Sequence, residues 1–388
     1  MRAKSLRPST GAALILRIRS QITASALLWT LVIAPPAARV AQSQGHRAGA
    51  ALDREIAARF APIFYQALGS QKRGDYITNF DYDGDWRGDN NWANAENRRF
   101  PMRAYVYYGV SETSTHFFIH YAVFHPRDYK GGASGSLLSE LIREGVKLGG
   151  RHDPTGLAED ITLAHENDME GCLVVVAKNG GDLGRATVTA VETMAHSQFL
   201  KYAPGDSSLK GFNRVRLEDQ RPELYIEPKG HGIKSYEEIE KLSSRRDILI
   251  YRFAGKADDP ENQNQAETVG YELLSIYDTL WPRAQSGINE TYGATYNYAT
   301  MKVSVAQGSG KVKSQQIKLG SLGVAFSGKI GAQNIARPPW GWFERNEREK
   351  SPGPWFFDPA SVIKQHFKLG DNFSTAYLHA PFLGVFRQ

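Results

Sequence analysis

The sequence predicts a mainly β fold of the α+β class, in which a β-sandwich core carries helical insertions, peripheral helices and a C-terminal aromatic extension. Two runs rich in Tyr, Phe, Val and Ile, joined by a short polar turn, predict a hairpin. Further short apolar runs follow the hairpin, and segments with helix periodicity flank them. With 388 residues, the chain is long enough for one large or two ordinary domains.

The first 41 residues form a basic leader without acidic residues. Its apolar run, residues 24–34, is followed by Pro35, Pro36 and small residues, which is typical of a secretory signal peptide. The run is too short to span a bilayer, which takes about 20 apolar residues. We expect a secreted or periplasmic protein with no integral membrane span in the mature chain. An uncleaved anchor and a mis-assigned start codon are the alternatives.

The positive charge of the chain is concentrated in this leader. Its six Lys and Arg residues equal the net charge of the whole chain, +6, so the remainder is close to neutral. This balance gives no electrostatic bias toward nucleic acid, and no glycine fingerprint for nucleotides is present. The single cysteine, Cys172, rules out an intramolecular disulfide. Its apolar neighbours raise a thiol pKa, which argues against a nucleophile.

The predicted elements begin with a helix over Leu52–Phe64, where apolar residues recur with helix spacing. A polar, Gly-rich loop with four alternating aspartates follows over residues 76–91. The strands Arg103–Val110 and Thr115–Phe124 then form the predicted hairpin. A helix is expected over residues 135–148.

Four more strands are predicted downstream, and they complete a β-sandwich domain over residues 52–255: Cys172–Ala177, Thr187–Glu192, Leu224–Glu227 and Ile248–Phe253. A C-terminal region over residues 256–388 is expected to pack on this domain. Its predicted helices are Ala266–Trp281, from apolar periodicity, and Phe357–Leu369, which opens on Asp-Pro. The segment between them is rich in Gly, Ser, Thr and Tyr.

A metal site is predicted where His165, Asp168 and Glu170 run into the apolar strand. Positions two apart on a strand share a face, so Asp168 and Glu170 point the same way, while His165 lies in the approach to the strand. Ligand sets dominated by carboxylates favour Mg²⁺, Ca²⁺ or Mn²⁺, and more imidazole would favour Zn²⁺. A solvated turn with an incidental histidine is the alternative.

This motif supports a family resemblance. The run His165-Glu-Asn-Asp168-Met-Glu170-Gly, followed by Val-Val-Val, resembles the His-Arg-His-Asp-Trp-Glu signature of the necrosis-inducing (necrosis- and ethylene-inducing-like) family of secreted cytolysins. The upstream run from His120 to Asp128 resembles the family's Tyr-Ser-Trp-Tyr-Phe-Pro-Lys-Asp segment. The pattern is also similar to the vacuolar-protein-sorting-associated family, whose later Gly-Ser-His would correspond to the run around His231.

The resemblance covers about 110 residues and implies a β-sandwich whose exposed divalent-ion site recognises a membrane lipid headgroup. It carries over three metal ligands, His165, Asp168 and Glu170, and a further acid near Glu159 or Asp160. Met169 stands where the signature has tryptophan, and the family's disulfide is missing. These departures weaken the implication of toxicity more than that of the metal site. The run Tyr-Ile-Thr-Asn-Phe-Asp-Tyr-Asp-Gly-Asp-Trp, residues 76–86, resembles chains of a divergent bacterial branch.

Other residues are weaker candidates. The aspartate loop offers alternating oxygens but lacks the glycine and the acid of an EF-hand, so a hydrogen-bonded turn is favoured over an irregular calcium site. His116 and His120 share a strand face among aromatic residues, and packing is the simpler interpretation. His196 and His231 both follow strands downstream of the motif, where they could converge on it as catalytic groups. The C-terminal aromatic run consists of Pro338–Phe343 and Trp355–Asp358. We expect it to pack over the sandwich as a clasp rather than to form a surface for lipid or sugar.

Three functions follow from these observations. The first is a secreted divalent-metal-binding protein that recognises a lipid or glycan headgroup and acts on membranes. The second is a metal-dependent hydrolase of phosphoesters or glycans, with His231 or His196 as general base. The third is an exported structural protein stabilised by its ion. The first is preferred, since the serine-hydrolase and zinc-protease signatures are absent from the sequence.

Overall fold

The computed structural model describes residues 49–69, 71–128, 164–237, 247–262, 268–308, 310–331, 336–344 and 351–387. These residues belong to one compact unit of the chain. The predicted leader, the predicted helix over 135–148 and the candidates Glu159 and Asp160 lie outside the described residues.

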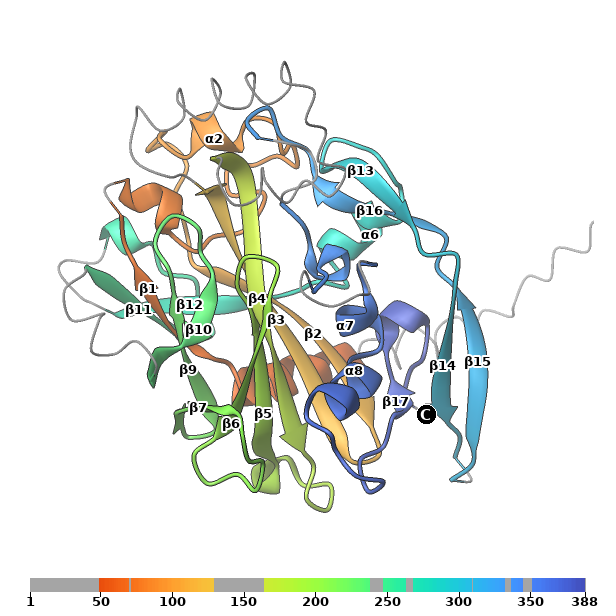
Figure 1. Cartoon of the computed structure of the whole chain (residues 1–388). Coiled ribbons are helices and arrows are strands. Elements are labelled where there is room, and N and C mark those ends of the chain that lie inside the picture. The colour runs from red at the N-terminus through yellow and green to blue at the C-terminus, as the bar shows by residue number, and fades with distance from the viewer. Residues whose placement is uncertain are drawn as a thin grey trace, which may run out of the picture. The chain divides into compact units, whose positions relative to one another are not determined.

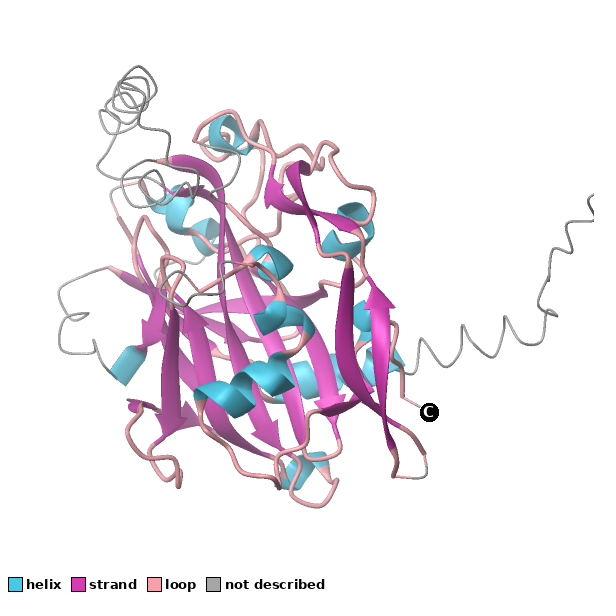
Figure 2. Ribbon diagram, turned by 45° about the vertical axis from the view of Figure 1, so that its right-hand side comes forward, coloured by secondary structure: helices cyan, strands magenta, loops and turns pink. Residues whose placement is uncertain are grey.

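Most of the described strands join one large mixed sheet (Figures 1 and 2). Its path runs β10-β9-β1-β11-β12-β2-β3-β4-β5-β6-β7. The strands along this path are β10 (Ile233–Ser235), β9 (Arg221–Ile226), β1 (Ile63–Ala67), β11 (Ile248–Phe253), β12 (Thr268–Ser275), β2 (Tyr105–Thr113), β3 (His116–Asp128), β4 (His165–Ala177), β5 (Thr187–Met194), β6 (Phe199–Pro204) and β7 (Asn213–Val215). β8 (Leu217–Glu218) pairs with β9.

The two ends of this path approach each other, so the sheet is nearly closed and barrel-like instead of forming the expected sandwich. The hydroxyl of Thr193 on β5 donates a hydrogen bond to the carbonyl of Ile233 on β10, 2.6 Å away. The sheet therefore curls around its own interior, where a sandwich would stack two separate sheets.

The interior of the curled sheet is apolar and includes a helix over residues 49–59. Ile56 of this helix and Phe60, which directly follows it, are buried against side chains of the central strands. The hydroxyl of Tyr121 on β3 donates to the carbonyl of Ala57 at 2.6 Å, which fixes the helix against the sheet. Burial of this kind contributes roughly 25 cal/mol per Å² of apolar surface.

The outer face of β2, β3 and β4 is covered by the C-terminal half of the chain. A second apolar cluster there contains Trp281, Trp340 and Trp355. The short helices are α6 (Leu280–Ala284), α7 (Pro354–Phe357) and α8 (Pro359–His366), with α2 (Asn91–Asn94) near the aspartate loop. The 3₁₀ turns are Lys72–Asp75, Leu183–Arg185, Pro260–Asn262, Pro339–Gly341 and Pro381–Leu383. The aromatic run is thus a buried clasp.

The segment between residues 292 and 326 forms strands that sequence reasoning left unassigned. β13 (Tyr292–Asn297) pairs with β16 (Ser321–Phe326). β14 (Thr300–Ala306) pairs with β15 (Val312–Lys318) as a hairpin and with β17 (Ala376–His379), which joins it to β2. The region after residue 255 therefore contributes strands to the main sheet itself.

The predicted helix over Ala266–Trp281 is wrong. Most of the described part of this segment is strand β12, and only its last residues enter α6. Val269, Tyr271 and Leu273 are buried at alternate positions, as a strand requires. Apolar residues of this segment also recur with helix spacing at several positions. Its pairing with β11 and β2 selects the strand over the helix.

Candidate metal and headgroup site

The candidate residues lie where β3 ends and β4 begins. The antiparallel register pairs His125 with Asp168 and Asp128 with His165. Asp168 and Glu170 alternate with Cys172 and Val174, which belong to the interior cluster, so the two carboxylates share the inner face of the sheet. The strand pattern therefore brings Asp168 and Glu170 to one side, as expected.

His165 is the first residue of β4 and does not lie in an approach to the strand, because the strand begins earlier than predicted. Strict alternation would place His165 and Asp168 on opposite faces. Between them, Asn167 has a φ of 60°, in the left-handed region that asparagine tolerates. Its side-chain amide donates to the carbonyl of Gly88 at 2.6 Å and accepts from Asn91 at 2.6 Å. This irregularity breaks the alternation, and the Asp168 carboxylate acts on His165 electrostatically.

Asp128 joins the cluster from β3, although it was not predicted to be a ligand. Its Oδ2 lies 3.4 Å from Nε2 of His165, and its Oδ1 is buried without a hydrogen-bond partner among the described residues. Burial opposes protonation of His165, yet the carboxylates of Asp128 and Asp168 raise its pKa to about 9. Asp128 ends the run already compared with the family segment, which is the signal that pointed to it.

Glu170 is the least compensated carboxylate of the cluster. Burial, together with the negative charge of Asp168, raises its pKa well above the usual value. Its Oε1 accepts from the backbone N–H of His196 at 3.3 Å, whereas its Oε2 has no partner among the described residues. The positive charge of His231 only partly offsets this cost, and no ion pair to Glu170 is formed by the described residues.

Asp168 is compensated by His231. The Nδ1–H of His231 donates to Oδ2 of Asp168 at 2.8 Å, and its Nε2–H donates to Oδ1 of Asp75 at 3.2 Å. Burial opposes the charge on each partner, but these hydrogen bonds lower the pKa of Asp168 and raise that of His231 to about 10. His231 also stacks on His125, with ring centroids 3.7 Å apart.

The two histidines proposed as general bases have different roles in this geometry. His231 is fully buried with both ring nitrogens engaged, so it orients Asp168 and is protonated at neutral pH. His196 is more exposed, and its Nε2 lies 2.9 Å from Oε2 of Glu227. Gly230 lies close to it, since a Cβ at that position would be 2.9 Å from Cε1 of the His196 ring. Asp75, far upstream in sequence, gave no signal of its part in this network.

A narrow slot opens next to the carboxylates. Asp168, Met169 and Glu170 line it together with Arg337 and Trp342 of the C-terminal region, and its volume is about 30 Å³. The indole Nε1–H of Trp342 donates to the carbonyl of Met169 at 3.2 Å. A Cβ on Gly171 would come within 2.5 Å of the Trp342 ring, so glycine is required for this close packing.

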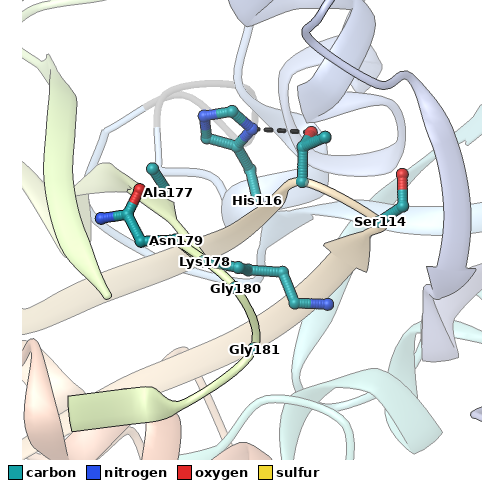
Figure 3. A pocket seen from close by; sticks show the side chains of 8 residues that line it. Ser114, His116, Ala177, Lys178, Asn179, Gly180 and Gly181 are labelled. Carbon is teal, nitrogen blue, oxygen red and sulfur yellow. Dashed lines mark hydrogen bonds between the residues drawn. The ribbon is translucent and has the colours of Figure 1, made fainter. Parts of the chain in front are cut away.

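His116 and His120 do not join this cluster. They lie toward the other end of β3, where His116 lines a separate pocket of about 440 Å³ with Lys178 (Figure 3). The His116 Nδ1 is 2.8 Å from the hydroxyl of Thr115, and Lys178 is paired with Glu112. His120 is buried, with its Nε2–H donating to the carbonyl of Trp355. Burial lowers the pKa of both histidines to about 4.

The aspartate loop is a hydrogen-bonded turn in this structure. Asp83 accepts from the side chain of Asn94 at 2.6 Å, and Asp85 accepts from the backbone N–H of Arg87 at 2.8 Å. Asp81 and Asp89 are likewise engaged by neighbouring side chains. These contacts account for the alternating aspartates without an ion.

Among the described residues, no group of three or more His, Cys, Asp or Glu side chains is arranged so that it could hold a metal ion. In the cluster itself, the His165 ring faces the carboxylate of Asp128, and the carboxylate of Asp168 accepts a hydrogen bond from His231. The residue types nevertheless suit a hard cation, because two buried carboxylate oxygens have no hydrogen-bond partner within the described part of the chain and lie near a third carboxylate. Within the described residues, no helix is both long and apolar enough to cross a bilayer.

Comparison with known proteins gives structural neighbours alone. No family model matches the sequence, and no curated protein matches it. The protein NLPPya in complex with mannosamine is similar over 58% of this chain and 73% of its own, at 15% identity and a TM-score of 0.26. The non-toxic HaNLP3 protein matches over 57% of this chain and 74% of its own, at 14% identity and a TM-score of 0.26.

A third neighbour is Necrosis and Ethylene inducing Protein 2 from the causal agent of cocoa's Witches Broom disease. It matches over 57% of this chain and 73% of its own, at 12% identity and a TM-score of 0.25. At these values the similarity is one of coarse β architecture.

Proposed function

We propose that this chain is an exported protein that binds a divalent metal ion at the start of β4 and recognises a lipid or glycan headgroup there. The observation that supports the proposal is a pair of buried carboxylate oxygens, Oδ1 of Asp128 and Oε2 of Glu170, that have no hydrogen-bond partner among the residues the structure describes. A buried polar atom without a partner is costly, and a bound cation would remove this cost.

Asp128, Asp168, Glu170 and His165 would hold the ion. Three of the four groups are carboxylates, and carboxylate-rich sets suit Mg²⁺, Ca²⁺ or Mn²⁺. His231, held by Asp75, would keep Asp168 oriented, as residues that bind metal ligands commonly do. The ion would supply a positive charge to which a hydroxyl or phosphate oxygen of a headgroup can bind.

The slot beside the carboxylates supports recognition of a small polar group. Its volume of about 30 Å³ has room for little more than one functional group. Arg337 and Trp342 contribute a cation and an aromatic ring, side chains that commonly contact phosphates and sugars. The identity of the headgroup, and any action on membranes, rests on the motif resemblance described above.

The hydrolase alternative is less well supported. A general base must accept a proton near the operating pH, and protonated His231 has no free ring nitrogen. His196 has its Nε2 engaged by Glu227. Turnover of phosphodiester, lipid or glycan substrates with added metal would reverse this preference.

The test is calorimetric titration of the chelator-treated protein with Ca²⁺, Mg²⁺ and Mn²⁺, followed by glycan and lipid headgroup panels that include mannosamine and glucosamine. In thermal unfolding of the same protein, ion binding is expected to raise the melting temperature by roughly 5 °C at saturation. Glu170→Gln should lose the effect, and Glu237→Gln, an exposed control, should keep it.

Three outcomes are informative. Ion-dependent headgroup binding would support the whole proposal. An ion that raises the melting temperature without any headgroup binding would reduce the site to a structural one. The absence of any ion effect in the wild type, or its retention in Glu170→Gln, would contradict metal binding at this position.

A further inference from the structure

The β14–β15 hairpin lies in a part of the chain with an unusual charge. Residues 291–343 contain five lysines and one arginine and no acidic residue. The predicted leader accounts for the whole net charge of +6, so this basic segment is balanced by acidic residues elsewhere in residues 42–388. The near-zero net charge of residues 42–388 therefore hides an uneven distribution of charge, in which residues 291–343 are strongly basic.

Four of these lysines are exposed on the hairpin. Lys302 is on β14, Lys313 and Lys318 are on β15, and Lys311 directly precedes β15. None of the four has an ion-pair partner among the described residues. The other two cations of the segment differ, since Lys329 pairs with Asp89 and Arg337 lines the slot.

The hairpin has one packed face and one free face. Val303 and Val305 are buried and point to the apolar cluster under the clasp. The register places Lys302 opposite Gln316 and Lys318 opposite Thr300, so both lysines project from the other face. Val312, opposite Ala306, shares that free face, whereas Lys313, opposite Val305, is exposed on the side of the packed face. The figures show the ribbon at the side of the molecule, where β15 is outermost (Figures 1 and 2).

An exposed apolar residue accompanies the charge. Val312 is 62% exposed and lies between Lys311 and Lys313. A nucleic acid would bind the lysines but gain nothing from an apolar side chain between them. An anionic bilayer attracts lysines to its surface and accepts an apolar residue at the boundary of its acyl region.

We propose that the free face of the β14–β15 hairpin is a docking surface for an anionic lipid bilayer. Lys302, Val312 and Lys318 share this face, and the exposed Lys311 and Lys313 add positive charge at the end of the hairpin. The lysines bind the negative surface without selecting a headgroup, and Val312 enters the interface. This contact is separate from the candidate metal site and requires no ion. It would hold the protein at a membrane whatever the site at the start of β4 binds.

A simpler role for these lysines is protection of the sheet edge. In the described part of the chain, β15 pairs with β14 alone, so one edge of its backbone is open to other strands. Lysines on an edge strand are a common means of preventing aggregation. The two roles differ in what is lost when the charge is removed: bilayer binding in one, and the monomeric state in the other.

The test is co-sedimentation of the purified protein with phosphatidylcholine vesicles that contain or lack phosphatidylserine. The variant changes Lys302, Lys311, Lys313 and Lys318 to Gln. One control changes the same four to Arg, and a second changes four exposed lysines elsewhere, Lys72, Lys210, Lys256 and Lys368, to Gln. Both Gln variants lower the net charge equally. Two lysines of the second control, Lys72 and Lys256, also lose ion pairs with Asp247 and Asp258.

The wild type is expected to bind the anionic vesicles, to release them as salt is raised and to ignore a chelator. The hairpin Gln variant should lose about tenfold or more in partitioning, while both controls stay within about twofold. Wild-type binding by the hairpin Gln variant would overturn the proposal. So would self-association of that variant with vesicle binding retained, or a preference of the wild type for duplex DNA over vesicles.

The chelator separates this inference from the proposed function. Vesicle binding that persists with a chelator and is lost in the hairpin variant supports the docking surface even if no metal binds. Vesicle binding that disappears with the chelator and survives in the hairpin variant would support the metal site and refute the hairpin.

Discussion

Strand β4 has two buried halves with opposite chemistry. From Cys172 to Val176 it is apolar on both faces and belongs to both hydrophobic clusters. From His165 to Glu170 it is equally buried but carries an imidazole and carboxylates. The pKa values of His165 and Glu170 are shifted, and one Glu170 oxygen has no hydrogen-bond partner in the described ranges. Equal burial therefore has different consequences: the first half stabilises the fold, and the second half is maintained at a cost that a ligand would offset.

The largest effect is expected in the apolar half. Leu173 is fully buried against the clasp, so Leu173→Ala should reduce the free energy of unfolding by about 2–5 kcal/mol through a lost side chain and a cavity. Urea unfolding monitored by circular dichroism would measure this. A loss below about 1 kcal/mol would mean that the clasp does not depend on this half of the strand.

The next effect concerns His120, which pairs with Leu173 and contacts Trp355. Burial lowers its pKa to about 4, so the unfolded chain takes up the proton first as the pH falls. Stability should therefore decrease from about pH 6.5 to about pH 4, by roughly 2–3 kcal/mol from this group. Melting curves over that range would show a smaller decrease in His120→Gln. Equal slopes in the two proteins would contradict the assignment.

A small effect is expected from Glu170→Gln when a chelator is present. Burial and Asp168 raise the pKa of Glu170, so its uncharged form is favoured without an ion, and glutamine is close to that form in shape. The free energy of unfolding should change by less than about 1 kcal/mol. A destabilisation comparable to that of Leu173→Ala would show that the Glu170 charge has a structural partner.

The smallest expected effect is chemical modification of Cys172. Burial raises the pKa of this thiol, and the side chain is fully enclosed by the apolar half of β4. Iodoacetamide should leave the native protein unmodified, as mass spectrometry would show, and should modify it once it is unfolded in urea. Rapid alkylation of the native protein would mean that this half of the strand is open to solvent.

Local patterns were sufficient to predict some of the molecule. Alternation placed Asp168 and Glu170 on one face, and β-branched and aromatic runs predicted β2, β3, β5 and β11. Alternation could not predict the position of His165, because the positive φ of Asn167 is fixed by hydrogen bonds to distant loops. The helix predicted across β12 failed for a related reason, since its neighbours β11 and β2 decide its conformation.

Long-range contacts account for the rest. Asp75 supports His231 from a turn far away in sequence, and no spacing rule connects the two. Asp128 lies at the end of a strand whose pairing with β4 places it beside His165. Closure of the sheet depends on how β10 meets β5, which no single segment encodes. The charge of the β14–β15 hairpin was present in the sequence but hidden by the neutral total.

The most direct test of the central claim is a crystal structure of the protein soaked with Mn²⁺, with anomalous diffraction recorded to locate the metal. The account predicts an anomalous peak bounded by Asp128, Asp168 and Glu170, with His165 turned from Asp128 toward the ion. A peak elsewhere, or no peak at an Mn²⁺ concentration that saturates other carboxylate sites, would contradict the account.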